Sequence, residues 1–132
     1  MKYILLIYTD EKHWTTASQA EQAAMMTEYR AFTDSIKAAG SYLGGEPLAP
    51  VGTATTVRVR NGRLQTTDGP FAETREQLGG FYLIDAKNLD EAIAAAGRIP
   101  GARVGSIEVR PIWAMPSADT ASAGAAAKAG HA

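Results

Sequence analysis

The sequence predicts an α+β fold, in which a ferredoxin-like split β-α-β antiparallel sheet carries two helices on one face and forms half of a dimeric α/β barrel. Two observations lead to this fold. The hydrophobic patterns follow one another in the order β-α-β-β-β-β-α-β, with a hairpin around Asn61-Gly62 as an inserted ribbon. Two helices can cover only one face of such a sheet, so its apolar second face needs another layer, which a second copy supplies most simply. We therefore expect a homodimer with its two sheets packed face to face.

Length and composition narrow the class of protein. A chain of 132 residues corresponds to one domain, and an apolar content of 45% is ordinary for a globular protein. The net charge is −1, which argues against nucleic acid as a partner, because proteins that bind phosphate backbones carry a basic excess. The sequence contains no cysteine, which excludes disulfides and thiolate chemistry.

The apolar run at residues 3–8 is far too short to span a bilayer, so we expect no membrane anchor. Asp10 and Glu11 follow it, where a signal peptide would carry a cleavage site made of small residues. A cytoplasmic location is the resulting expectation.

The first strand is expected at residues 2–9 and the first helix from Ser18 onward, with a loop between them at residues 10–17. Ser18 and Glu21 have the spacing of a capping box. Gly40 is placed to end the helix in a left-handed conformation. The apolar stripe of this helix recurs at steps of four, three and four residues and consists of Met25, Tyr29, Phe32 and Ile36.

A strand at residues 42–48 and a hairpin at residues 55–67 follow. The pair Gly44-Gly45 interrupts the strand and predicts a bulge or a close approach by another group. Asn61-Gly62 is the preferred two-residue type I′ turn of a hairpin. Pairing outward from it sets Arg60 opposite Arg63, Val59 opposite Leu64, and Arg58 opposite Gln65. One face is therefore apolar and the other basic, and we interpret the basic face as a solvated surface that prevents aggregation in preference to a substrate-binding surface.

The C-terminal part supplies a strand at residues 80–85, a second helix, and a last strand at residues 104–111. Asn88 and Glu91 form a predicted cap and N3 pair for the helix. The side chains expected to face inward are Leu89, Ala92, Ile93 and Ala96 of the helix and Ile107 and Val109 of the strand. Residues 1–114 form the expected domain. Residues 116–132 contain no large apolar side chain, so residues 115–132 are expected to be a flexible Ala/Gly/Ser-rich tail.

Several motifs resemble the DGPF-domain proteins of the YCII-related family. The central one is Thr67-Asp68-Gly69-Pro70-Phe71, in a loop richer in glycine and charge than a simple connection needs. Collinear matches flank it at residues 1–8, 44–48, Glu73, Glu76, 79–82 and 105–111. The resemblance covers roughly residues 1–114 and implies a ferredoxin-like α/β barrel dimer.

The resemblance implies less about the reaction, because the DGPF branch has no agreed activity. Some YCII-related proteins look like small-molecule enzymes with a His and an Asp in the cleft, and members of the DGPF branch are often associated with sigma factors of the extracytoplasmic-function type. Asp68 is the counterpart of the relatives' Asp, whereas their His has no match here, since His13 lies in a different loop.

Asp68 is the candidate catalytic residue. Partial burial beside Phe71 and Tyr82 would raise the pKa of its carboxyl and suit it to general base catalysis. The alternative is structural, because an Asp before Gly-Pro often caps a turn through its own side chain. The candidate substrate-binding residues are Glu46, Phe71, Glu73, Tyr82 and His13.

No cofactor and no metal are expected. Glu46, Asp68 and Glu73 could together hold a divalent cation, but no His or Cys ligand supports them. Glu73, Arg75 and Glu76 are alternatively a surface ion-pair cluster.

Two functions stay open. The first is a small-molecule ligand-binding protein, or a cofactor-independent enzyme of acid–base chemistry such as isomerisation or elimination around Asp68. The second is a non-catalytic dimeric regulatory or accessory module, in which the loop is a structural or protein-contact feature.

Overall fold

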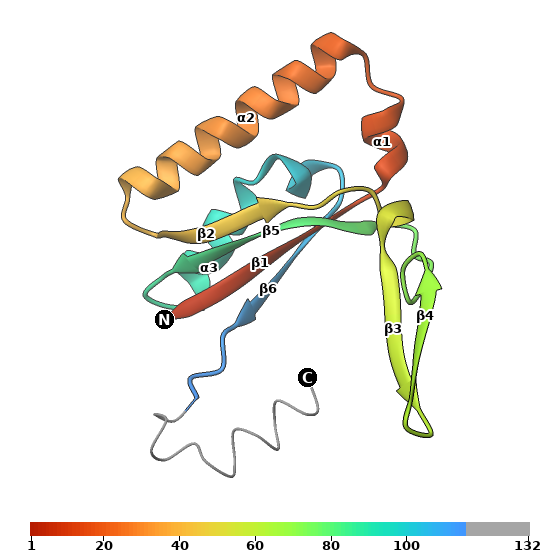
Figure 1. The fold of residues 1–132 in the computed structure, drawn as a ribbon. Helices are drawn as coiled ribbons and strands as arrows, with labels where there is room; N and C mark the ends of the chain where they lie inside the picture. The colour runs from red at the N-terminus through yellow and green to blue at the C-terminus, as the bar shows by residue number, and fades with distance from the viewer. Residues whose placement is uncertain (116–132) are drawn as a thin grey trace.

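The computed structural model describes residues 1–115, so residues 116–132 of the predicted tail lie outside the described residues. Its main feature is an antiparallel sheet of four strands in the order β2-β5-β1-β6 (Figure 1). The strands are β1 (Lys2–Thr9), β2 (Tyr42–Pro47), β5 (Gln77–Asp85) and β6 (Ser106–Pro111). With one helix after β1 and one after β5, this is the ferredoxin-like split β-α-β arrangement. The predicted α+β class, with a split β-α-β antiparallel sheet and two helices on one face, is confirmed.

Two helices, α2 (Gln19–Ala38) and α3 (Leu89–Gly97), cover one face of the sheet. The buried core between these layers consists of Tyr3, Leu5, Ile7, Tyr82, Ile84 and Ala86 of the sheet and its flank, Phe32 and Ile36 of α2, Ala92 and Ala96 of α3, and Ile99. Since side chains alternate along a strand, the intervening residues point the other way, and within residues 1–115 no helix lies over them. We call this side the uncovered face, formed by Ile4, Leu6, Tyr8, Glu46, Phe81, Leu83, Ser106, Glu108 and Arg110.

The ends of α2 follow the local sequence rules. Ser18 Oγ accepts a hydrogen bond from Glu21 N at 3.1 Å, and Ser18 N donates to Glu21 Oε1 at 2.9 Å, so the predicted capping box is confirmed. Gly40 has a φ of +75°, as predicted for the residue that ends this helix. Among the described residues no helix is long and apolar enough to cross a membrane.

Helix α3 begins as predicted, with Asn88 Oδ1 accepting from Glu91 N at 3.0 Å. Its predicted buried stripe is only half right. Ala92 and Ala96 are buried, but Leu89 and Ile93 are 49% and 51% exposed. The side of α3 that faces the core consists of alanines, with Ala95 packed beside Ala92 and Ala96, so the buried stripe is rotated away from Leu89 and Ile93.

The prediction of a loop at residues 10–17 is wrong over its first part, where a short helix, α1 (Glu11–Thr15), follows β1 directly. The Asp10 carboxylate caps it by accepting from Lys12 N at 3.0 Å. Thr16 Oγ1 donates to Lys12 O at 2.6 Å and satisfies a carbonyl at the other end. Two short side-chain caps therefore suffice to stabilise a single helical turn.

The glycine pairs mark the irregular points of the sheet, as predicted. The β2–β5 register shifts between Tyr42 and Gly44, and the β1–β5 register shifts between Ile7 and Tyr8, opposite Gly79. Gly45 makes the predicted close approach, since a Cβ added there would lie 2.8 Å from Phe81 O. At each shift one residue, Leu43 or Gly79, has no partner in the strand opposite, so the chain bulges at both glycine pairs.

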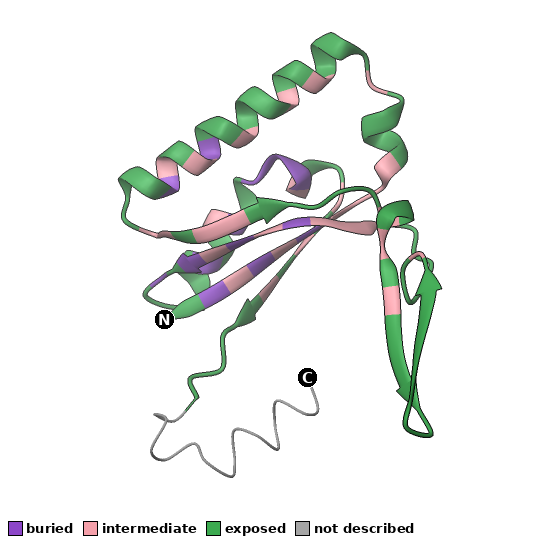
Figure 2. Cartoon of the chain, in the orientation of Figure 1, coloured by how far each residue is buried: buried purple, intermediate pink, exposed green. Residues whose placement is uncertain are grey.

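The hairpin of β3 (Thr55–Arg60) and β4 (Arg63–Asp68) forms a separate two-stranded sheet, which we call the arm. Its turn has positive φ at Asn61 (52°) and Gly62 (73°), and its pairing has the predicted register. A 3₁₀ turn, η1 (Val51–Thr53), leads into it, and a second, η2 (Pro100–Arg103), follows α3. Figure 2 shows the arm as almost wholly exposed. Among the described residues, no side chain of the arm is buried.

Candidate functional site

The loops at one end of the sheet are joined by hydrogen bonds that involve acidic and amide side chains. Glu11 N donates to Gln77 Oε1 at 2.9 Å, which ties α1 to the start of β5. Glu11 Oε2 in turn accepts from Val51 N at 2.9 Å, which ties α1 to η1. Loop 69–76, which carries most of the Asp-Gly-Pro-Phe motif, enters β5 at this same end. Helix α1, η1 and this loop therefore lie together at one end of the sheet.

A polar cluster lies on the uncovered face next to this end. Tyr8 Oη donates to Glu108 Oε1 at 3.3 Å, and Arg110 Nε lies 3.8 Å from Glu108 Oε2. Ser106 Oγ donates to Glu76 Oε1 at 2.8 Å. We call Tyr8, Glu76, Ser106, Glu108 and Arg110 the polar cluster.

The polar cluster sits beside apolar residues. Leu6 pairs with Phe81 on one side and with Glu108 on the other, and Ile4 pairs with Leu83 and Arg110 in the same way. Directly opposite residues of an antiparallel pair share a face of the sheet. The uncovered face therefore combines an apolar floor with a few convergent polar groups, as ligand-binding surfaces do.

Burial and the neighbouring Glu108 carboxylate raise the pKa of the Tyr8 phenol above its ordinary value. Tyr8 is therefore protonated at neutral pH and acts as a hydrogen-bond donor, while the Glu108 carboxylate acts as the acceptor. The cluster offers both a donor and an acceptor to a molecule bound on this face.

Asp68 ends β4 at the base of the arm, where it is exposed and pairs with Thr55. Its carboxylate accepts no hydrogen bond from any residue of the described range. The turn that follows is held by other groups: Gly69, with a φ of +97°, donates its N–H to Ala54 O at 2.7 Å, and its carbonyl accepts from Thr56 Oγ1 at 2.8 Å. Within residues 1–115 Asp68 therefore does not act as the turn cap that the structural alternative predicts.

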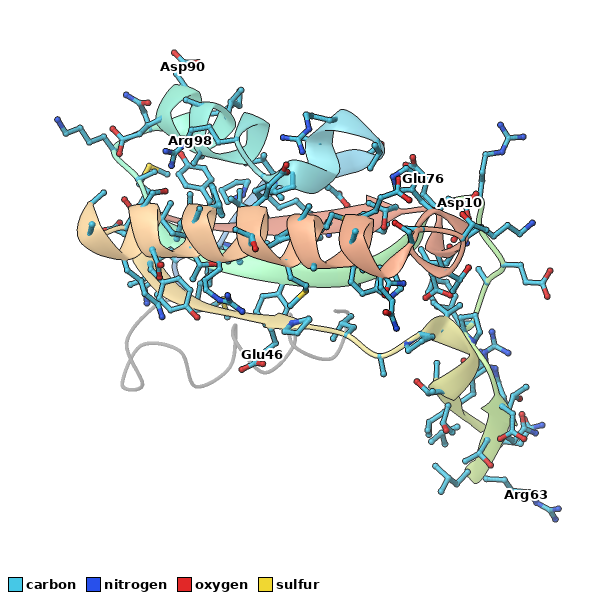
Figure 3. All side chains as sticks on the ribbon, turned by 90° about the horizontal axis from the view of Figure 1, so that it is seen from above. Asp10, Glu46, Arg63, Glu76, Asp90 and Arg98 are labelled. Carbon is cyan, nitrogen blue, oxygen red and sulfur yellow. The ribbon has the colours of Figure 1, made fainter. Side chains whose placement is uncertain are left out.

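The other predicted site residues are spread over the chain. Glu46 is exposed on the uncovered face, opposite Phe81, and Figure 3 shows it on the side of the sheet away from Asp90. Phe71 is 79% exposed in loop 69–76. Glu73 is exposed in the same loop, and His13 is exposed in α1. Glu46 thus lies on the uncovered face, whereas Phe71, Glu73 and His13 lie at one end of the sheet. Within residues 1–115 no hydrogen bond or ion pair joins any two of these four side chains.

Tyr82 lies on the other side of the sheet. It is buried in the core, where its ring packs edge-on against Phe32 at 5.1 Å and its Oη lies 2.7 Å from Thr33 Oγ1. The predicted pairing of Tyr82 with Asp68 in one site is not present in the single chain, because residue 82 of β5 points toward α2.

The family motifs at residues 1–8, Glu76 and 105–111 include every residue of the polar cluster, but the sequence alone does not single these residues out as a site. The expectation for Glu76 is a surface ion-pair cluster, but within residues 1–115 it forms a hydrogen bond with Ser106 and no ion pair with Arg75. The last strand carries one further signal. Glu108 and Arg110 alternate with Ile107 and Val109, so a sheet covered on both faces would bury charged side chains on β6.

Two shallow grooves are found on the helical layer instead of at the loops. One, of about 300 Å³, is lined by Glu28, Ala31, Phe32, Ser35, Arg98, Pro100 and Arg103. The other, of about 290 Å³, lies next to it and shares Arg98. Neither contains a predicted site residue. In the described part of the chain, no three His, Asp or Glu side chains come together as metal ligands.

Comparison with known proteins gives one family. The sequence pattern of the YCII-related domain matches residues 1–116. An uncharacterised protein of Rhizobium meliloti (strain 1021) is 40% identical over 114 residues, which cover 85% of this chain and 92% of that protein.

One solved structure is also similar in shape. It is 5-chloro-2-hydroxyhydroquinone dehydrochlorinase (TftG) from Burkholderia phenoliruptrix AC1100, in complex with 2,5-dihydroxybenzoquinone. Its sequence is 14% identical, the match covers 88% of this chain and 96% of that chain, and the TM-score is 0.48. At this level of likeness the activity of that enzyme says nothing about this chain.

Proposed function

The chain belongs to the YCII-related family, and from this premise we propose that it is a cytoplasmic homodimer that binds a small organic molecule on the uncovered face of its sheet, beside loop 69–76. The polar cluster carries this proposal, because its hydrogen-bonding groups converge on an otherwise apolar strand surface. A surface used only for subunit packing needs no such groups, whereas a ligand site needs a small number of them to fix orientation.

The homodimer is supported by the uncovered face itself. Ile4, Leu6, Phe81 and Leu83 remain only half-buried in the single chain. A second sheet packed on this face would remove the rest of these side chains from water, and each would contribute a part of the about 1.5–3 kcal/mol that burial from full exposure provides. The ligand would then lie between the two sheets, in an environment where the polar cluster acts more strongly than in water.

The chemistry proposed for the bound molecule is proton transfer. The single O–H of Tyr8, which donates to Glu108 in the free chain, turns to the bound molecule, and the freed Glu108 oxygen accepts a hydrogen bond from it. Asp68 is the proposed general base of the adjoining loop. Glu46, Phe71 and Glu73 are its proposed further contacts, and His13 is a proposed lid residue on α1. Tyr82 is left out of the site because its ring lies in the core.

A non-catalytic regulatory or accessory module is the second candidate. One observation favours it: the Asp68 carboxylate is exposed in the single chain, and it lines neither of the two grooves on the helical layer. Such a module would have no use for a donor–acceptor pair on the sheet, so the two candidates differ in what the polar cluster does.

Binding of small uncharged hydroxylated molecules, with glycerol and 4-hydroxybenzyl alcohol as probes, tests the proposal, because the Glu76 and Glu108 carboxylates accept hydrogen bonds from hydroxyl groups and repel anions. In amide NMR titrations of the intact protein, we expect shifts concentrated on β1, β6 and loop 69–76. Glu108→Gln and Tyr8→Phe are expected to weaken binding about tenfold or more, which corresponds to the loss of one hydrogen bond to a charged group. Asp90→Asn on α3 is the matched control and should bind as the unmodified protein does, because Figure 3 shows Asp90 on the opposite side of the molecule from Glu46.

Two results would contradict the proposal: probes that shift only residues on the helical layer, or probe binding that Glu108→Gln and Tyr8→Phe leave unchanged. Asp68→Asn separates the two candidate functions. If the chain is an enzyme, this substitution abolishes turnover of a bound substrate while the fold persists; if it is a module, no turnover is present to lose.

A further inference from the structure

The arm has apolar side chains that nothing in the described chain covers. Val57, Val59 and Leu64 are 58%, 59% and 70% exposed. An isolated two-stranded hairpin is at best marginally stable in water, and a regular ladder of six residue pairs joins these two strands. The arm therefore has the composition and regularity of an element that packs against something.

The register of the arm places Asp68 on its apolar face. Val59 pairs with Leu64, Val57 with Thr66, and Thr55 with Asp68. Opposite residues share a face and alternate residues along a strand share it too, so these three pairs lie on one side, with Asp68 at the base. The arginines at positions 58, 60 and 63 lie on the other side and form no ion pair with any residue in the range 1–115.

The direction of the arm points to the space below the uncovered face. In Figure 1 the arm runs downward across the direction of the sheet strands, away from α2. Figure 3, seen from above, shows α3 and the arm on opposite sides of the sheet. The arm thus stands beside the volume that a second layer on the uncovered face would occupy.

A second copy of the chain is the occupant that fits this volume. Its sheet is already the proposed partner of the uncovered face, so the arm extends that same interface. The other possible source is the chain's own C-terminal part, but residues 116–132 contain no Val, Leu, Ile, Met or aromatic residue that could bury the arm. In a two-fold dimer each arm would extend to the other subunit, so the same contact would occur twice.

From these observations we infer that the apolar face of the arm, Val57, Val59 and Leu64, packs against a second copy of the chain, and that this contact encloses Asp68. The site is then incomplete in one chain, and each subunit needs the other to surround its Asp-Gly-Pro-Phe motif. The arginine face stays in solvent, where its charge keeps the arm from pairing with other strands. This inference rests on the proposed homodimer.

Two substitutions on neighbouring residues test the packing of the arm. Leu64→Lys places a charge on the apolar face, and Gln65→Lys places the same charge on the opposite face of the same strand. Sedimentation equilibrium of the intact protein should show the dimer dissociation constant rising about tenfold or more for Leu64→Lys, since a buried leucine contributes about 1.5–3 kcal/mol. Gln65→Lys should change it by less than about twofold. Hydrogen exchange should lose the protection of β3 and β4 in Leu64→Lys while β1 and β5 keep theirs, which shows that the subunit is folded.

The access of solvent to residue 68 is measured in a separate experiment. The sequence has no cysteine, so Asp68→Cys introduces a single thiol whose rate of alkylation by iodoacetamide reports its access to solvent. We expect alkylation to be slow at high protein concentration and to become at least about tenfold faster on dilution or in the added presence of Leu64→Lys.

Three results distinguish failure of the proposed arm contact from failure of the proposed homodimer. A chain that is monomeric at all concentrations overturns the homodimer and the inference together. A dimer that Leu64→Lys leaves unchanged, but that Leu6→Lys on the sheet disrupts, overturns the inference alone. Protection of the arm that disappears when the chain is ended at Met115 assigns the contact to the C-terminal part and also overturns it.

Discussion

At the scale of single residues, Gly45 occupies the tightest point between β2 and β5. A Cβ added there would lie 2.8 Å from Phe81 O and 2.9 Å from Tyr82 Cδ1, whereas the neighbouring Gly44 has no atom within 4 Å of its would-be Cβ. The two positions have the same residue type, the same strand and similar burial. They differ in whether a side chain can be accommodated.

We expect Gly45→Ala to lower the free energy of unfolding by about 1–3 kcal/mol, because β2 or the Tyr82 ring must shift to make room. Gly44→Ala is the matched control and should leave it unchanged or raise it by about 0.5 kcal/mol, since alanine loses less backbone entropy on folding. Urea unfolding monitored by circular dichroism measures both. Equal effects at the two positions would show that the close approach at Gly45 does not constrain the sheet.

Two residues of the predicted site, Asp68 and Tyr82, differ in how far the sequence predicts their positions. Asp68 was predictable as a notable residue because its motif is conspicuous, and its position at the base of the arm follows from the hairpin register. The direction of Tyr82 did not follow in the same way. Phe81 and Tyr82 are adjacent aromatic residues, either of which suits the core, and the pairing of Tyr82 with the buried Leu5 of β1 sets which one faces α2.

At the scale of elements, the capping box of α2 is the strongest local signal in the chain. It satisfies two backbone N–H groups at the helix start through Ser18 and Glu21. The same helix supplies Phe32 and Ile36 to the core. Its first turn and its packing face are therefore coupled in one element.

Ser18→Ala should lower the free energy of unfolding by about 1 kcal/mol, because the N–H of Glu21 loses its acceptor at the helix start. Ser18→Asp keeps an acceptor there and should recover most of this loss. Thermal unfolding of the two variants, side by side with the unmodified protein, is the measurement. If Ser18→Asp is as destabilised as Ser18→Ala, the cap does not stabilise α2.

At the scale of the whole molecule, the partly buried phenol of Tyr29 and the buried phenol of Tyr82 make the stability of the domain depend on alkaline pH. Burial raises the pKa of Tyr29 and of Tyr82 above the ordinary value of 10.0. Tyr82 belongs to the sheet and Tyr29 to the helix packed on it, so ionisation of either places a charge between the two layers.

The sign of the effect follows from these raised pKa values. The folded state keeps its phenol protons to higher pH than the unfolded state, so the stability they contribute is fully present below pH 10.0 and is lost as pH rises through the folded-state pKa. We expect the free energy of unfolding, measured by urea titration from about pH 8 to pH 11, to fall in the upper part of this range. The fall should become shallower in Tyr82→Phe and shallower still in Tyr29→Phe/Tyr82→Phe. A slope that these substitutions do not change would assign the alkaline transition to other groups.

Residues adjacent in the sequence are enough to predict the features that depend on neighbours in the chain. The capping box, the left-handed Gly40, the type I′ turn at Asn61-Gly62 and the register of the arm all follow from backbone geometry within a few residues, and the structure confirms each of them. The order of the elements then left few topologies open, because ferredoxin-like connections are short and cover one face of the sheet.

Contacts between side chains far apart in the sequence depend instead on the tertiary structure. Tyr8 and Glu108 lie 100 residues apart along the chain, and their hydrogen bond depends on β1 and β6 being neighbours in register. In the same way, the arm's direction depends on how η1 and loop 69–76 leave the sheet, which no local pattern specifies. Local geometry is encoded by adjacent residues, whereas a site is assembled by packing, and packing is a property of the whole fold.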